Sequence, residues 1–257
     1  MSGGKDSTAL AIYMKDKIPD MEYVFCDTKK ELVETYEYLD KIEAYLQKPI
    51  VRLCDDRGFD HWLEVYGGFL PSGQMRWCTS MLKIKPFEKY IGDDPIKMYV
   101  GIRADENRMG YVSTKQNIEA VYPFKDDGIR RDDVIRILEE ADIGLPDYYS
   151  WRTRSGCYFC FFQRKSEWVG LLENHPELYE LSKKYEKQDQ SGNGFTWSQT
   201  ESLVQLSDPK RVSEIKENNA KAIARESKHR PNQPLSEILA DVNDGEDDDQ
   251  ACFFCHL

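Results

Sequence analysis

Ser2-Gly3-Gly4-Lys5-Asp6-Ser7-Thr8 opens the chain and leads directly into a helical pattern over residues 8–17. Paired glycines let the backbone approach an oxyanion closely, and successive amides at a helix N-terminus form an anion site. Ser2 and Ser7 add hydroxyl donors, and Lys5 adds a positive charge. The stretch therefore predicts a phosphate-binding loop, for which a plain turn that caps a helix is the alternative. The loop residues are Ser2, Gly3, Gly4, Lys5, Asp6 and Ser7.

Beyond this loop, strand-like and helix-like segments alternate. Strands are predicted over residues 21–27, 50–54 and 97–102, and helices over residues 30–46 and 132–142. Such alternation implies parallel strands joined by right-handed crossovers. We therefore predict an α/β fold with a mostly parallel, doubly wound sheet, followed by a C-terminal helical region. That region contains predicted helices within residues 166–187, 210–227 and 235–242.

The same patterns divide the chain into three parts. Residues 1–150 form the expected nucleotide-binding α/β domain, and residues 151–240 a helical region that contains cysteines. Residues 241–257 form an acidic linker and a C-x-x-C tail. An acidic, polar segment of this kind has the composition of a solvated linker.

Composition excludes several classes of protein. The chain has 257 residues, of which 40% are hydrophobic and 32% charged, with a net charge of −11. It contains no apolar run of membrane-spanning length and begins with no secretory signal pattern, so we expect a cytoplasmic protein that does not enter a membrane. The overall acidity argues against nonspecific duplex binding through phosphate charge.

Seven cysteines point to metal ligands or reactive thiols, because a chain without a secretory signal is a poor candidate for disulfides. Two C-x-x-C pairs stand out among them. The cysteines are Cys157 with Cys160, Cys252 with Cys255, and the single residues Cys26, Cys54 and Cys78.

Four motifs carry a resemblance to a known family, and the last of them is the C-x-x-C segment of residues 154–160. The loop resembles the PP-loop of ATP pyrophosphatases, S-G-G-x-D-S. Residues 76–87 are similar to the C-C-x-x-R-K-x-x-P-L segment of adenylylsulfate reductases, with Cys78 and Lys83 on matching positions, although Thr79 replaces the second cysteine. Residues 101–106 resemble a G-x-R-x-x-E motif. Together they resemble the phosphoadenosine phosphosulfate (PAPS) reductase family of the PP-loop superfamily, especially its DndC-like and phage-encoded branches.

The resemblance implies a nucleotide site and catalytic groups. It implies ATP with Mg²⁺, or PAPS or adenylylsulfate, as the bound nucleotide. Asp27, at a predicted strand end, is a candidate nucleotide contact. Lys83 and Arg103 would stabilise developing charge, with Glu106 orienting Arg103, and Cys255 of the tail is a candidate catalytic thiol.

The resemblance also implies a metal centre. Cys78, Cys157 and Cys160 fall on cluster-ligand positions of the family, which implies an iron–sulfur cluster of the 4Fe–4S type. Zinc is the alternative, because grouped thiolates also suit a tetrahedral zinc site. A fourth family cysteine is missing, and Cys26, Cys54 or a tail cysteine could replace it.

Three functions remain open on these residues. The first is ATP-dependent adenylation coupled to sulfur transfer, with a sulfur donor such as a cysteine desulfurase and a nucleic acid as one candidate acceptor. The second is reduction of PAPS or adenylylsulfate to sulfite by the tail cysteine, with a thioredoxin-type reductant. The third is a non-enzymatic, metal-stapled nucleotide-binding protein.

One expectation concerns the middle of the sheet. In PP-loop enzymes the loop follows a central strand, but here Met1 directly precedes Ser2. A sheet without that strand would hold unpaired backbone groups. We therefore expect either that the first strand is missing upstream of Met1 or that another segment fills its place in the sheet.

Overall fold

A computed structural model describes residues 1–107, 115–188, 194–198 and 200–226. The described chain divides into two compact units, residues 1–160 and residues 161–226. The sequence predicts a boundary after residue 150, whereas residues up to Cys160 lie in the first unit. The predicted helix over residues 235–242 and the tail with Cys252 and Cys255 lie outside the described residues.

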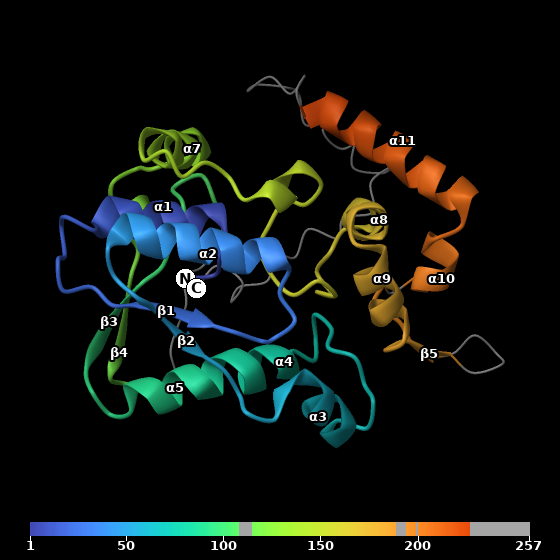
Figure 1. Cartoon of the computed structure of the whole chain (residues 1–257), viewed down its shortest axis with the longest axis horizontal. Coiled ribbons are helices and arrows are strands. Elements are labelled where there is room, and N and C mark those ends of the chain that lie inside the picture. The colour runs from blue at the N-terminus through green and yellow to red at the C-terminus, as the bar shows by residue number, and fades with distance from the viewer. Residues whose placement is uncertain (108–114, 189–193, 199, 227–257) are drawn as a thin grey trace. The chain divides into compact units, whose positions relative to one another are not determined.

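Helices and short strands alternate through the first unit (Figure 1). The predicted helix over residues 30–46 is α2, and the predicted strand over residues 21–27 is β1. The helices are α1 (Lys5–Met14), α2 (Val33–Leu46), α3 (Gly58–Val65), α4 (Trp77–Thr79), α5 (Lys85–Ile91), α6 (Pro123–Asp126) and α7 (Arg131–Glu140). The strands are β1 (Tyr23–Cys26), β2 (Ile50–Leu53), β3 (Ile96–Tyr99) and β4 (Ile118–Val121).

The strands pair in parallel, as the alternating pattern predicts. Tyr23 of β1 lies opposite Ile50 of β2, and Ile96 of β3 lies opposite Ile118 of β4. The α/β class and the parallel pairing are thus confirmed. Among the described residues, however, β1–β2 and β3–β4 are two separate pairs and do not join into one sheet.

The main core of this unit forms where α1, α2 and α7 pack on β1 and β2. Helix α1 contacts α7 extensively, and Phe124, Val134 and Leu138 are fully buried against it. Leu39 and Ile42 of α2 are fully buried on the same side. Helix α1 and the glycine loop that precedes it therefore rest on a rigid support.

A helical stretch over residues 77–91, absent from the sequence-based elements, follows an irregular course. Between α4 and α5 lies a π-helical turn, Ser80–Ile84, in which the Lys85 amide bonds the Ser80 carbonyl. Pro86 lacks the amide hydrogen that a regular helix would use there. The wide turn places Lys83 beside β1, as described below.

The second unit is helical, as predicted. Its elements are α8 (Lys165–Asn174), α9 (Pro176–Lys183), β5 (Lys187–Gln188), β6 (Gly194–Phe195), α10 (Leu203–Leu206) and α11 (Pro209–Glu226). Trp168 lies 6.3 Å from Tyr179 and 6.2 Å from Trp197, measured between ring centroids. Tyr179 donates a hydrogen bond to the Leu203 carbonyl at 2.7 Å, so an aromatic cluster holds this small unit together.

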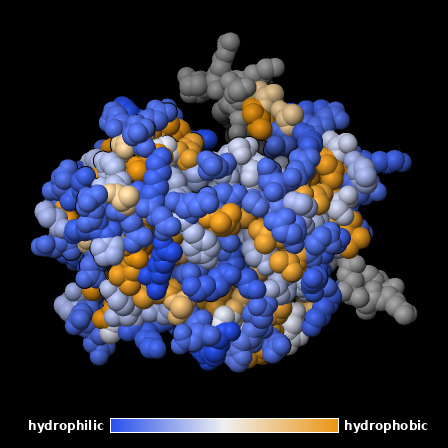
Figure 2. Space-filling model, viewed as in Figure 1, coloured by the Kyte–Doolittle hydropathy of each residue, from blue (hydrophilic) through white to orange (hydrophobic). Residues whose placement is uncertain are grey.

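Hydrophilic residues dominate the visible face of the molecule, and hydrophobic ones occur in small separate groups (Figure 2). Large exposed apolar side chains, such as Val33, Phe69 and Val204, are scattered over different elements. None of the helices in the described ranges is both long and apolar enough to cross a membrane.

Candidate functional site

The glycine loop wraps the N-terminus of α1 and is closed by its own side chains. The Ser2 amide donates to Ser7 Oγ at 3.1 Å, and the two serine hydroxyls lie 3.1 Å apart. Ser7 and Thr8 hydroxyls donate to the Gly4 carbonyl at 3.1 and 2.9 Å. These bonds pre-form a tight turn whose amides and hydroxyls are the kind of donors that phosphate oxygens accept.

Neither glycine position in this turn has room for a side chain. Gly3 has φ +71°, and a methyl group on it would lie 2.7 Å from Thr35 Cγ2 of α2. Gly4 has an ordinary φ of −103°, but its methyl group would lie 2.7 Å from Ser155 Oγ. The loop is therefore gripped from two sides by the protein.

The segment over residues 148–155 braces the loop from a distant part of the chain. Tyr148 donates to the Gly3 carbonyl at 2.7 Å, the Lys5 amide donates to Tyr149 Oη at 3.2 Å, and Ser155 Oγ donates to Ser2 Oγ at 3.2 Å. Burial raises the pKa of both tyrosines, which keeps their hydroxyls protonated. Sequence reasoning did not single out Tyr148 and Tyr149, because no motif marks them, whereas Ser155 lies in the C-x-x-C segment of residues 154–160.

Asp6 is buried beneath the loop between two cations. Its Oδ2 lies 2.5 Å from Lys5 Nζ and its Oδ1 lies 2.7 Å from Arg103 Nη1. Burial by itself would raise the pKa of Asp6, but the charges of Lys5 and Arg103 outweigh burial and lower it. The carboxylate thus fixes both cations at the helix N-terminus.

Arg103 reaches Asp6 from the loop that follows β3. Its guanidinium also lies 3.1 Å from Glu106 Oε1 and 3.0 Å from Asp105 Oδ1. A methyl group on Gly101 would come within 3.0 Å of the Asp6 carbonyl, so the two loops touch. The structure therefore brings Arg103 and Glu106 to the glycine loop, with the guanidinium held among carboxylates.

Asp27 lies just past the end of β1 and is 2% exposed. Its Oδ1 accepts from Tyr36 Oη and from the Lys29 amide, each at 2.8 Å, and its Oδ2 lies 2.7 Å from Lys29 Nζ. These bonds hold the turn after β1. Tyr36 is a further residue that the sequence did not single out.

The remaining candidates surround the half-buried Cys157 thiol. Cys157 Sγ lies 3.1 Å from Thr28 Oγ1 and 3.7 Å from Glu31 Oε1, and Thr28 donates to the same Glu31 oxygen at 2.9 Å. Burial, followed by the charge of Glu31, raises the pKa of Cys157 well above its ordinary value. Arg152, fully buried, donates to the Gly156 and Cys157 carbonyls and so fixes this turn.

Lys83 and Cys26 approach the same region from other elements. Cys26 Sγ donates to the Lys83 carbonyl at 3.6 Å. Lys83 lowers the pKa of Cys157 through its charge, and Cys78 raises it, although burial dominates. Lys83 therefore lies near the thiols, on a different element from the Lys5–Asp6–Arg103 group.

The described residues do not bring the expected metal ligands into one group. Within the described ranges, no three His, Cys, Asp or Glu side chains are placed to hold a metal ion together. Cys157 is a hydrogen-bonded thiol, and the Cys160 amide donates to the Cys157 carbonyl at 3.1 Å in the same turn. Cys78, Cys157 and Cys160 therefore stay a predicted ligand set, and Cys255 lies outside the described residues.

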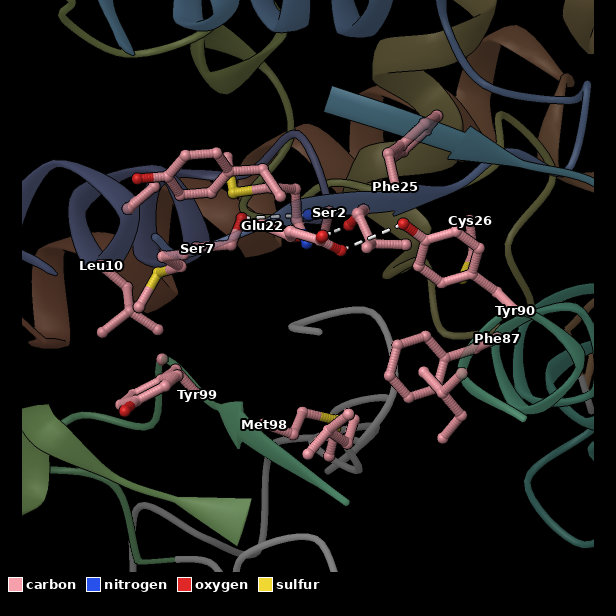
Figure 3. Close-up of a pocket in the computed structure, with 18 of the residues that line it drawn as sticks. Ser2, Ser7, Leu10, Glu22, Phe25, Cys26, Phe87, Tyr90, Met98 and Tyr99 are labelled. Carbon is pink, nitrogen blue, oxygen red and sulfur yellow. Dashed lines mark hydrogen bonds between the residues drawn. The ribbon is translucent and has the colours of Figure 1, made fainter. Parts of the chain in front are cut away.

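An apolar pocket of about 450 Å³ adjoins the loop (Figure 3). Ser2 and Ser7 line one end of it, and Cys26 of β1 lines a side. Met98 and Tyr99 of β3 lie across the open space from β1 in the close-up. The pocket thus lies between the two strand pairs.

Comparison with known proteins assigns the family. The sequence matches the phosphoadenosine phosphosulfate reductase domain over residues 1–158, which is more than half of the chain. The chain belongs to this family. The match covers the glycine loop, the motif with Arg103 and the turn with Cys157, so the resemblance of these segments to the PAPS reductase family is confirmed.

The relatives of this PAPS reductase family member include proteins from an archaeon and a phage. Two uncharacterized proteins of Methanocaldococcus jannaschii are 26% and 27% identical over 76% and 84% of this chain, and the chain spans 43% and 54% of their lengths. An uncharacterized nin region protein of Escherichia phage lambda is 24% identical over 66% of this chain and 67% of its own. The chain therefore spans about half the length of the archaeal relatives.

A solved structure is also similar to this chain. The phosphoadenylyl-sulfate (PAPS) reductase from Candida auris, in a phosphate complex, has a TM-score of 0.49 and 14% identity. The match covers 61% of this chain and 78% of that protein.

Proposed function

We propose that the chain binds the phosphates of ATP at the Ser2–Ser7 loop and cleaves ATP between the α- and β-phosphates to adenylate a substrate for sulfur transfer. The observation that carries this proposal is the braced loop at the N-terminus of α1, with Lys5 held beside it. Backbone amides and a lysine in this arrangement suit a leaving pyrophosphate. Membership of the PAPS reductase family supports a sulfur-related nucleotide reaction.

The proposed step is a displacement at the α-phosphorus. A nucleophilic oxygen of the acceptor forms a bond to the α-phosphorus, and the bond from that phosphorus to the bridging oxygen breaks. The electron pair leaves with pyrophosphate, and the AMP moiety stays on the acceptor. The loop amides, Ser7 and Lys5 would stabilise the charge that develops on the leaving group, because fixed donors need no reorganisation during the reaction.

The proposed step uses neither Mg²⁺ nor an iron–sulfur cluster. Both oxygens of Asp6 already contact cations, so within the described residues of the loop this carboxylate is not open to Mg²⁺. A magnesium ion would bind here through the phosphate oxygens of the nucleotide. No group of three metal-binding side chains occurs among the residues that the structure describes, and so no step is routed through iron and sulfide.

Reduction of a sulfonucleotide is the second candidate. It is favoured by the family itself, whose name describes this reaction. The same loop and Arg103 would bind PAPS or adenylylsulfate, and a thiol would attack the sulfur, release the nucleotide and leave a thiosulfonate that a thioredoxin-type dithiol reduces to sulfite. The thiol proposed for this attack is Cys255.

The test is release of pyrophosphate from ATP by the full chain, assayed without and with thiol reductant. Lys5→Met should lower the rate at least about tenfold, because it removes a charge-assisted contact worth more than about 1.4 kcal/mol. Lys17→Met, at the exposed end of the same helical segment, is the matched control and should leave the rate unchanged.

Other outcomes separate the alternatives. Sulfite release from PAPS with no turnover of ATP would contradict adenylation and favour sulfonucleotide reduction. Tight binding of ATP in a calorimeter without turnover of either nucleotide would favour the non-enzymatic binding protein. Loss of sulfur transfer in Cys255→Ser, with cleavage of ATP intact, would place the tail thiol in a step after adenylation.

A further inference from the structure

Lys5 turns back onto the residue that follows it in the chain. Its Nζ lies 2.5 Å from Asp6 Oδ2, although consecutive side chains of a helix do not face each other and Lys5 is the first residue of α1. The contact therefore requires the lysine stem to bend along the helix. Among the described residues, Asp6 is the one carboxylate that this ammonium contacts.

Arg103, the second cation on Asp6, is held by more partners. Its Nη1 lies 2.7 Å from Asp6 Oδ1 and 3.1 Å from Glu106 Oε1, and its Nε lies 3.0 Å from Asp105 Oδ1. A planar guanidinium can bond several carboxylates at once, whereas a lysine ammonium is a compact charge on a flexible stem. Of the two cations on Asp6, Lys5 is therefore the one that can move away.

Asp6 stays paired when Lys5 moves. The bond from Arg103 to Oδ1 remains, so the buried carboxylate does not become an unpaired charge. The Lys5 side chain is 13% exposed and that of Asp6 is 2% exposed, so a ligand from solvent reaches the ammonium and not the carboxylate. Tyr149 accepts a hydrogen bond from the Lys5 amide at 3.2 Å, and its ring centroid lies 6.0 Å from Nζ, so the backbone is fixed while the stem moves.

We propose that Asp6 is a positioning residue for Lys5, which holds the ammonium at the start of α1 and releases it to the phosphate oxygens of a bound nucleotide, while Arg103 keeps the carboxylate paired. This inference rests on the proposed function, in which Lys5 stabilises the leaving pyrophosphate. The release belongs to binding, so the ammonium is already in place when charge develops in the reaction. Phosphate must compete with Asp6 for Lys5, and the pair therefore lowers the affinity for phosphates.

The first test measures binding of inorganic pyrophosphate to the full chain by titration calorimetry, in a double-mutant cycle. Asp6→Asn should tighten binding about fivefold or more, because Lys5 no longer leaves a carboxylate when it binds phosphate. In a Lys5→Met background the same change should alter the dissociation constant less than about twofold. A general effect of the lost negative charge would instead appear equally in both backgrounds. Asp127→Asn, the control, removes an exposed carboxylate beside Lys17 and should alter binding less than about twofold.

A second measurement uses the unaltered chain, because Asp6→Asn leaves two cations around a neutral side chain and can prevent folding. Nuclear magnetic resonance of the isotopically labelled chain detects the Lys5 ammonium, whose signal is assigned by its loss in Lys5→Met. The scalar coupling between Lys5 Nζ and the Asp6 carboxyl carbon should be present without pyrophosphate and disappear when pyrophosphate binds. The ammonium signal of Lys17, beside Asp127, is the internal reference and should stay in place.

Three results would overturn this inference alone. They are equal tightening by Asp6→Asn in both backgrounds, weaker binding by Asp6→Asn than by the unaltered chain, and a coupling between Lys5 and Asp6 that persists in the pyrophosphate complex. In each of them pyrophosphate still binds, so the proposed phosphate site stands. Failure of the unaltered chain to bind pyrophosphate would overturn the proposed function together with this inference.

Discussion

At the scale of single residues, the glycine loop is shaped by neighbours far away in the sequence. Any residue can adopt the backbone conformation of Gly4, so glycine is needed there because a side chain would overlap the Ser155 hydroxyl. Glycine is needed at position 3 both because φ is positive and because a side chain would overlap Thr35. The two glycines of this turn are therefore required by contacts with two other segments of the chain.

Gly4→Ala should destabilise the first unit by about 1–3 kcal/mol, because its methyl group overlaps Ser155 Oγ. Ser155→Gly in the same protein should recover much of that loss. A double-mutant cycle in urea measures the coupling between the two positions. Additive effects of the two changes would contradict the close approach.

The Asp6 ion group predicts a specific response to acid. Arg103→Met removes one of its two cations and should cost about 3–5 kcal/mol near neutral pH. The lowered pKa of Asp6 stabilises the fold above its unfolded pKa near 3.8, and this contribution disappears as the pH falls through the lowered value. Loss of Arg103 raises the pKa of Asp6, so acid unfolding should begin at a higher pH.

The control for this change is Arg136→Met, which breaks an exposed ion pair with Asp133 on α7. It should cost less than about 1 kcal/mol and leave the acid transition in place. Circular dichroism between pH 2 and pH 7 compares the two variants. An unchanged acid midpoint in Arg103→Met would show that Asp6 does not depend on this cation.

At the scale of elements, a brace and an irregular helix position the site. The segment over residues 148–158 closes over the loop and also carries Cys157 against Thr28 and Glu31. The π-helical turn at Ser80–Ile84 brings Lys83 to Cys26 of β1. Wide helical turns of this type occur frequently at functional sites. This one lies beside β1 and lines the apolar pocket with Lys83 and Ile84.

Tyr148→Phe tests the brace. It deletes the buried hydrogen bond to the Gly3 carbonyl and should lower the free energy of unfolding by about 1–2 kcal/mol and weaken binding of ATP. Tyr13→Phe removes an exposed hydrogen bond to Asp127 at the far end of α1 and should change neither. Calorimetric titration and urea unfolding give the two readouts. Equal behaviour of the two variants would contradict a bracing role.

At the scale of the molecule, the candidate site lies wholly within residues 1–160. The second unit has its own aromatic core of Trp168, Tyr179 and Trp197. A ligand that binds the native loop should therefore stabilise the unit that contains it.

ATP at one hundred times its dissociation constant should stabilise the first unit by about 2.7 kcal/mol. Hydrogen exchange should slow over the loop, α1 and the bracing segment, with peptides from α8 to α11 as the internal reference. A matched sample of Lys5→Met should show little protection at the same ATP concentration. Protection confined to residues 161–226 would place the nucleotide site elsewhere.

The sequence by itself determined the local features. The glycine loop, the α2 helix, the first two strands and the helical second unit follow from short-range patterns, because helix and strand periods are written in neighbouring residues. The family followed from the loop together with the motif that holds Arg103 and the turn that holds Cys157. Residues 77–91 and β4 escaped prediction, since Pro86 interrupts the helical pattern and β4 is only four residues long.

Only the tertiary structure decided which distant groups meet. Tyr148 and Ser155 reach the loop across 145 and 153 positions of sequence, and Glu31 meets Cys157 across 126. No local pattern encodes such contacts, because they depend on how crossovers bring strand ends together. The same reason applies to Cys157: the family resemblance marked it as a metal ligand, but only the fold shows that its thiol lies against Thr28 and Glu31.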